Sequence, residues 1–302
     1  MVRIGITYLY TISAYGYPPA WEDDVKALSD IRSMGFHFLE MEALGQQHAE
    51  GVLAHKEEFL EALSANDIHV HNFCIVDPEL VALDKDRRAA ALERFRRMAQ
   101  LGRELGAETF HLASYAPPVE YPAGRPYALG EKYTIKDRFS VRIPAGFSWN
   151  AVWSALVESC RACADLAADR VILMEPRIGE TVCSADALLR LIMEVDRPNF
   201  KGNFDTGHFS AGRECVPLAL KKLEGHFANI HISDNDPSNV RHIPVGKGTI
   251  DWDEFFRLLK EAEYNGYLGI DLTASETLRQ DLLDSADFIL KMARKVGLEI
   301  EI

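Results

Sequence analysis

Four side chains that can bind a divalent metal ion follow short apolar runs in the second half of this 302-residue chain. They are Glu175, Asp205, His231 and Asp271, and the run before Glu175 reads Val-Ile-Leu-Met. Apolar runs of this length are typical of buried parallel strands. Three carboxylates and one imidazole suit Mn²⁺, Mg²⁺ or Co²⁺, and they can also bind Zn²⁺.

Side chains of this kind at the C-terminal ends of successive parallel strands are how a (β/α)8 barrel builds an active site. The rest of the sequence has the alternation of strand-like and helix-like segments that such a barrel requires. The expected strands are 3–8, 36–41, 68–73, 108–113, 171–175, 200–205, 227–232 and 267–272. The expected helices are 21–34, 56–65, 87–105, 149–168, 185–195, 216–223, 251–262 and 277–296. We therefore predict a single α/β domain over residues 1–302, a (β/α)8 TIM barrel.

One segment interrupts the alternation. Residues 114–148 are rich in Pro, Tyr and Gly and lie between the fourth expected strand and its helix. A connection this long is typical of a functional loop. Its aromatic residues offer amphipathic contact area, and they are Tyr115, Tyr121, Tyr127, Tyr133 and Phe147. We expect a lid or a subunit-contact loop, with a surface insertion of no chemical role as the alternative.

Composition excludes several classes of function. The formal net charge is -13, with 47% hydrophobic and 26% charged residues. Nucleic acids and anionic membranes attract cationic surfaces, so this charge argues against non-specific binding to either. No apolar stretch approaches the roughly 18 residues of a membrane span, and the N-terminus lacks the pattern of a signal peptide. Five cysteines, an odd number, are typical of reduced thiols. We expect a cytoplasmic protein that binds a small molecule.

More polar side chains lie near the same ends of the expected strands: Glu40, Glu42, His71, His111 and His208. Each of these residues alone is more often structural than functional. Together they would be costly to bury, because each unpaired buried polar group costs roughly 1–3 kcal/mol. A metal ion and a polyhydroxyl ligand would satisfy them jointly, which favours one common site.

Several sequence motifs support a family assignment. They are Gly35-Phe-His-Phe-Leu-Glu40, Leu173-Met-Glu175, Asn203-Phe-Asp-Thr-Gly-His208, His231-Ile-Ser-Asp234, Pro244-Val-Gly-Lys-Gly-Thr-Ile-Asp-Trp252 and Gly266-Tyr-Leu-Gly-Ile-Asp271. Through these motifs the chain resembles the sugar phosphate isomerase/epimerase superfamily, the xylose isomerase-like TIM barrels. The resemblance covers essentially the whole chain except residues 114–148.

The resemblance implies a metal-dependent mechanism. Glu175, Asp205, His231 and Asp271 would hold one divalent cation, with Mn²⁺ favoured, and a carbonyl-bearing sugar would bind it through two adjacent oxygens. The cation would stabilise the enediolate that forms when a proton leaves the carbon beside the carbonyl. Glu175 and Asp271 would pass this proton. His208 would hydrogen-bond the substrate oxygens and could shuttle a proton near neutral pH.

Two departures from the family pattern bear on the reaction. The last ligand is usually Glu, whereas this chain has the shorter Asp271, and ketose 3-epimerases carry an Arg where this chain has Pro237. These departures weaken a strict two-base 3-epimerase and leave room for one-base isomerisation or elimination. Arg177, Arg241 or His242 could replace the missing Arg. The expected substrate contacts are His71, His111, Arg177, Arg241 and His242.

The leading function is therefore a metal-dependent sugar isomerase or epimerase, and a lyase is the first alternative. An enolate made beside the keto group of an oxidised C-glycoside can expel an aryl group. The aromatic loop, Phe147-Ser-Trp149 and Glu175-Pro-Arg-Ile-Gly-Glu180 resemble the larger subunit of bacterial C-glycoside deglycosidases. Those enzymes pair such a barrel with a small β-rich subunit. We expect either a homo-oligomer or a hetero-oligomer with a small partner.

Two further alternatives carry less support. Endonuclease IV binds extra zinc ions, and its additional histidines match His71, His111, His208 and His242. Val240 stands where that family has Asp, and the acidic chain lacks an evident DNA-binding face. A barrel that only binds a sugar would not need a metal-ligand set.

Overall fold

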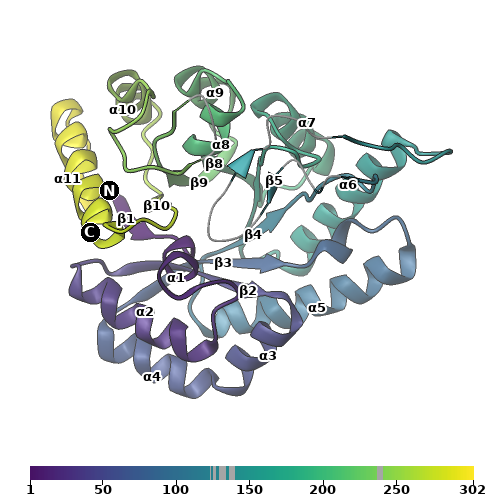
Figure 1. Cartoon of the computed structure of the whole chain (residues 1–302), viewed down its shortest axis with the longest axis horizontal. Helices are drawn as coiled ribbons and strands as arrows, with labels where there is room; N and C mark the ends of the chain where they lie inside the picture. Colours follow the sequence, from purple (N-terminus) through teal and green to yellow (C-terminus); the bar gives the residue numbers. More distant parts are fainter. Residues whose placement is uncertain (123, 125–126, 129–133, 136–139, 237–240) are drawn as a thin grey trace.

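Eight parallel strands close into a barrel, because β1 is hydrogen-bonded to both β2 and β10 (Figure 1). The computed structural model describes residues 1–122, 124, 127–128, 134–135, 140–236 and 241–302. The barrel strands, in spatial order, are β1 (Val2–Ile6), β2 (Phe38–Leu44), β3 (His69–Val76), β4 (Thr109–Ala113), β7 (Val171–Glu175), β8 (Phe200–Asp205), β9 (Phe227–Ile232) and β10 (Tyr267–Ile270). A short strand, β11 (Ile300–Glu301), also pairs with β1. The predicted TIM barrel is confirmed.

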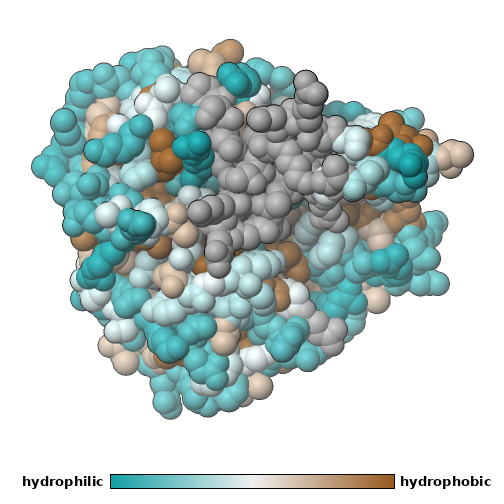
Figure 2. Space-filling view, viewed as in Figure 1, coloured by the Kyte–Doolittle hydropathy of each residue, from teal (hydrophilic) through white to brown (hydrophobic). Residues whose placement is uncertain are grey.

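One helix that packs on the outside of the barrel follows each strand or its loop (Figure 1). These helices are α2 (Trp21–Ser33), α4 (Lys56–Asn66), α5 (Lys85–Glu104), α6 (Trp149–Leu166), α7 (Ala185–Val195), α9 (Val216–Lys222), α10 (Trp252–Glu261) and α11 (Leu278–Val296). Polar side chains cap several N-termini: Asp84, Ser148, Ser184 and Asp251 each accept a first-turn backbone N–H. The outward faces of these helices are largely hydrophilic (Figure 2).

The apolar core fills the layer between strands and helices, where Phe95, Phe110, Phe204, Phe255 and Phe256 are fully buried. Successive side chains of a strand point to opposite faces, so those that do not face the helices point into the barrel. Many of these inward side chains are polar and equally buried, among them Asn72, His111, Asn203, Asn229 and Glu175. The barrel thus carries an apolar outer layer and a polar interior.

Short helices in the loops at the strand C-termini were not predicted. They are α1 (Leu9–Tyr15), α3 (Gly45–Ala54), the 3-10 helix η1 (Pro78–Val81) and α8 (Thr206–Ala211). Helices of this length are marginal in isolation and depend on tertiary packing. Their apolar residues pack on the barrel; Leu9, Val52 and Phe209 are all buried.

The long connection after β4 lies partly outside the described residues. In its described parts, β5 (Tyr127–Ala128) pairs antiparallel with β6 (Thr134–Ile135), and Glu120 forms a bridge with Arg142. The position of Tyr133 and the side chain of Tyr127 are not described, so the lid or contact role stays a prediction. In the part of the chain that the structure describes, no helix has the length and apolar character for crossing a membrane.

Candidate functional site

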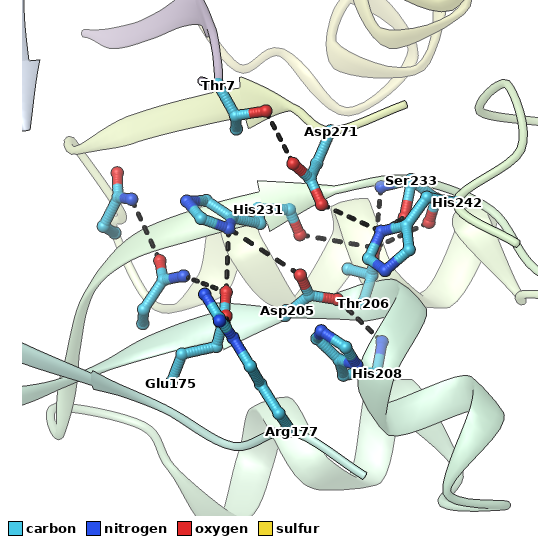
Figure 3. Close-up of polar contacts among 12 residues, drawn as sticks. Thr7, Glu175, Arg177, Asp205, Thr206, His208, His231, Ser233, His242 and Asp271 are labelled. Carbon is cyan, nitrogen blue, oxygen red and sulfur yellow. Dashed lines mark hydrogen bonds and ion pairs between the residues drawn. The ribbon is translucent and has the colours of Figure 1, made fainter. Parts of the chain in front are cut away.

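Strand register brings the metal-ligand candidates to one end of the barrel. Asp205 on β8 is the register partner of His231 on β9, and Gly269 on β10 is the partner of the same His231 on its other side. Glu175 ends β7, the next strand beyond β8. Asp271 directly follows β10. The four candidates therefore lie on consecutive strands, and their side chains converge on one space (Figure 3).

Three of the four form a tight group. One ligand atom from each of Glu175, Asp205 and His231 lies within 4.8 Å of the others, and all three side chains are buried. His231 Nδ1 is 2.8 Å from Glu175 Oε1 and 3.7 Å from Asp205 Oδ2. Two carboxylates and one imidazole at these distances are a chemically suitable set for a divalent cation.

Asp205 presents one oxygen to this space that accepts no hydrogen bond from the described residues. Its Oδ1 accepts the backbone N–H of His208 at 2.7 Å, because Asp205 is the N-cap of α8. Its Oδ2 is buried and has no hydrogen-bond partner among the described residues. Burial, with further contributions from Glu175 and Asp271, raises the pKa of Asp205 to about 7. An unpartnered buried carboxylate oxygen is costly unless something binds it.

His231 lies between two carboxylates, with one at each ring nitrogen. Its Nε2 is 2.9 Å from Glu40 Oε2, on the side opposite Glu175. Burial alone would lower the pKa of His231, but Glu40 and Glu175 outweigh burial and raise it well above its usual value. Asn72 donates to Glu40 and holds that carboxylate in place. If a cation replaced the proton on Nδ1, Nε2–H could still donate to Glu40.

Glu175 is fixed from three directions. Asn203 Nδ2 donates to Glu175 Oε1 at 2.7 Å, His231 faces the same oxygen, and Arg177 Nε donates to Oε2. Burial would raise the pKa of Glu175, but Arg177, His231 and His111 hold it well below its usual value. Glu175 is therefore ionised at neutral pH.

Asp271 lies at the same mouth, but it does not join the three-residue group. Its Oδ1 accepts the hydroxyl of Thr7 at 2.6 Å, and its Oδ2 lies 2.8 Å from His242 Nδ1. Burial would raise the pKa of Asp271, but His242 lowers it. Both oxygens thus have protein partners, and a role as the fourth ligand stays a prediction.

The other expected site histidines lie at different depths. His111 is fully buried between Glu40 and Glu175, 3.8 Å from each. His71 lies deeper, because it stacks on Tyr267, which precedes Gly269 and Asp271 on the same inward face. A substrate at the mouth of the barrel would therefore reach His71 only by passing the inward side chains at the level of His231.

His208 and Arg241 also differ from expectation in their environments. Burial and the nearby His242 lower the pKa of His208 to about 3. The ring is neutral near pH 7, which suits a hydrogen bond to substrate and does not suit a proton shuttle. Arg241 lies at the rim with a side chain 58% exposed, 3.7 Å from Asp236.

Several supporting residues were missed by sequence reasoning: Thr7, Asn72, Asn203 and Asn229. Asn229 donates to Asn203 at 2.9 Å, and Asn203 donates to Glu175. Asn203 and Asn229 each stand two positions before a ligand candidate, so they point into the barrel from the same strands. A polar residue at this spacing in an otherwise apolar strand was the signal that could have found them.

Comparison with known proteins agrees with this architecture. A family model described as a xylose isomerase-like TIM barrel matches residues 28–292. The L-ribulose-5-phosphate 3-epimerase UlaE of Salmonella paratyphi A is 23% identical over 292 residues, covering 93% of each chain.

Two solved structures show the same fold at low identity. The 3-keto-D-glucoside 4-epimerase YcjR of E. coli has a TM-score of 0.72 at 19% identity, over 96% of this chain and 100% of that one. The D-psicose 3-epimerase of Clostridium cellulolyticum H10 has a TM-score of 0.71 at 18% identity, over 99% and 100%. Since the family model spans most of the chain, this protein belongs to the xylose isomerase-like TIM barrel family.

Proposed function

We propose that this protein is a sugar isomerase or epimerase that enolises a carbonyl-bearing sugar with the help of one divalent metal ion. The observation that carries the proposal is the buried Asp205 Oδ2, which has no hydrogen-bond partner among the described residues and lies 3.7 Å from His231 Nδ1. The compared proteins support the reaction class, because each is named as a sugar epimerase.

Glu175, Asp205 and His231 would hold the cation, with Asp271 as the fourth ligand from the neighbouring strand. This donor set favours Mn²⁺ and also suits Mg²⁺, Co²⁺ or Zn²⁺. When bound, the cation would polarise the sugar carbonyl and stabilise the negative charge that develops on its oxygen.

The protein side chains then handle the proton. Glu175 is ionised at neutral pH, so it can accept the proton from the carbon beside the carbonyl. Arg177 now occupies Glu175 Oε2 and would have to turn toward a substrate oxygen for that atom to act as the base. The neutral ring of His208 would orient a substrate hydroxyl.

The face on which the proton returns decides the product. Burial would lower the pKa of His242, but Asp271 and Asp205 raise it, so a protonated ring is favoured beside Asp271. Return of the proton by Glu175 to the neighbouring carbon would give isomerisation. Delivery from the Asp271–His242 pair to the opposite face would give epimerisation.

Metal analysis and proton exchange test the proposal together. The metal-free protein is reloaded with Mn²⁺, Mg²⁺, Co²⁺ or Zn²⁺ and incubated in D2O with a panel of ketoses and aldoses. We expect deuterium to enter the carbon beside the carbonyl only with metal, as followed by NMR. Full activity after exhaustive chelation would contradict the proposal.

One comparison favours a second candidate with the same enolising step. The YcjR fold neighbour is named for a 3-keto-D-glucoside, an oxidised sugar like the substrate of a C-glycoside lyase. If the carbon next to the enolate carries an aryl group, the electron pair can form a new C=C bond while the bond to the aryl group breaks and the aryl carbon takes up a proton. Release of a free phenol from a 3-keto-C-glycoside would assign the lyase reaction, and co-purification of a small partner protein would support the heteromeric form.

A further inference from the structure

Barrel enzymes frequently bind a substrate phosphate with the loops that follow the seventh and eighth strands. In this chain these strands are β9 and β10. The loop after β9 contains Gly246, Lys247 and Gly248, and the loop after β10 leads through residues 271–277 into α11. Both loops contain N–H or hydroxyl donors, so their present partners decide whether a phosphate fits.

A buried carboxylate already takes the donors of the first loop. Asp234 Oδ2 accepts the Gly246 N–H at 3.0 Å and the indole N–H of Trp252 at 2.7 Å. Asp234 Oδ1 accepts the Ile250 N–H at 3.3 Å. The loop wraps closely around this carboxylate, since a Cβ on Gly248 would lie 2.2 Å from Oδ1. The Gly-Lys-Gly turn thus packs around an internal anion, and the Gly246 N–H points at that anion and not at a ligand.

A second carboxylate takes the donors after β10. Asp281, in the first turn of α11, accepts the hydroxyl of Ser275 at 2.6 Å and that of Thr277 at 3.0 Å on the same Oδ2. An acid at this position also satisfies the positive end of the helix. In the described residues of both loops, a carboxylate of the chain therefore already accepts side-chain or backbone donors that a phosphate would use.

We propose, on the basis of the function proposed above, that the substrate is a sugar or glycoside without a phosphate group. A phosphate monoester carries about -1.5 to -2 charges near pH 7, and beside Asp234 and Asp281 it would meet like charge instead of free donors. The two described cations of this loop, Arg241 and Lys247, are both exposed, and Arg241 faces Asp236 at 3.7 Å, so solvent screens the attraction they offer to a phosphate. The proposed substrate thus differs from that of the matched UlaE proteins, whose name specifies a 5-phosphate.

Paired substrates test this proposal. The Mn²⁺-loaded protein is assayed by deuterium exchange with L-ribulose and L-ribulose 5-phosphate, and with D-psicose and D-psicose 6-phosphate. We expect kcat/KM at least about tenfold higher for the free sugar of a pair, and no saturable binding of inorganic phosphate below about 1 mM by calorimetry. A preference for the phosphorylated sugar, or millimolar phosphate binding, would overturn it. Exchange with no sugar of either kind would contradict the proposed function, and the phosphate titration would still decide this inference.

A charge-removing variant tests the cause of the discrimination. Asp281→Ala frees the hydroxyls of Ser275 and Thr277, and we expect the ratio of kcat/KM between free and phosphorylated sugar to fall several-fold. Asp284→Ala is the matched control, because Asp284 lies on the same helix and contacts only Gln280 among the described residues, at 2.8 Å. Equal ratios in both variants would overturn the role assigned to Asp281.

Discussion

Three of the four metal-ligand candidates are held from behind by a second polar side chain, and the fourth, Asp205, is held by the backbone N–H of His208. Asn203 holds Glu175, Glu40 holds His231, and Thr7 holds Asp271. Such outer contacts fix the orientation and tautomer of a metal ligand and commonly change metal affinity by about 10–100-fold when lost. The orientation of these ligand candidates is therefore set in part by residues outside the group of Glu175, Asp205 and His231.

Glu40→Gln tests this support. The variant keeps an acceptor oxygen near His231 Nε2 but loses the charge, and we expect Mn²⁺ affinity to fall about 10–100-fold in a calorimetric titration. Glu42→Gln is the matched control on the same strand. Burial raises the pKa of Glu42 to about 8, so at pH 7 this carboxyl is mostly protonated and resembles an amide. Equal losses of affinity in the two variants would contradict a specific role for Glu40.

Glu175→Gln tests the base. The amide cannot accept a proton, so we expect deuterium exchange to fall by about 10²–10⁴-fold even at saturating metal. The side chain keeps its size and its contact with Asn203, so thermal unfolding of the metal-free variant should show a folded protein. Exchange at the wild-type rate would mean that another residue removes the proton.

Prediction from sequence succeeded for elements whose pattern is local. The strands 171–175, 200–205 and 227–232 begin and end where expected. A polar side chain at the C-terminal end of each strand, or next to it, made Glu175, Asp205 and His231 predictable as neighbours. The pattern could not show that His242 would take Asp271 Oδ2, nor that His71 would stack on Tyr267, because these contacts join residues far apart in the chain.

One half-buried acid, Glu180, connects the segment after β4 to the loop after β7. Glu180 Oε2 accepts the Ser114 N–H at 3.0 Å, the Ser114 hydroxyl at 3.1 Å and the Tyr115 N–H at 2.8 Å. Glu180→Ala leaves these donors unpaired, and we expect the free energy of unfolding in urea to fall by about 1–3 kcal/mol. Glu224→Ala, which removes an exposed ion pair with Lys221, should change it by less than about 0.5 kcal/mol. Equal changes in the free energy of unfolding for both variants would show that Glu180 does not stabilise the contact between these two loops.

At the scale of the whole molecule, the barrel interior concentrates negative charge in a chain of net charge -13. Glu40, Glu175, Asp205 and Asp271 are all buried around one space. In the metal-free protein, protons offset part of this charge: the pKa of Asp205 is about 7, and that of His231 is raised well above its usual value. A cation that binds Asp205 and His231 must displace these protons.

This competition predicts that the metal stabilises the fold more at pH 8 than at pH 6. Because burial places the folded pKa of Asp205 at about 7, above its usual value of 3.8, the proton-linked stability of the metal-free protein is lost as the pH rises through 7. Above that pH the metal no longer competes with this proton. Below pH 7, each displaced proton lowers the apparent affinity for the metal about tenfold per pH unit, or about 1.4 kcal/mol. The loss of the proton from Asp205 is the single cause of both changes, and it widens the difference in Tm between protein with and without a fixed Mn²⁺ concentration. Scanning calorimetry at the two pH values measures this difference. In Asp205→Asn, which cannot titrate, the difference should depend less on pH. A wild-type difference that is equal at both pH values, or larger at pH 6, would show that the metal does not bind at Asp205.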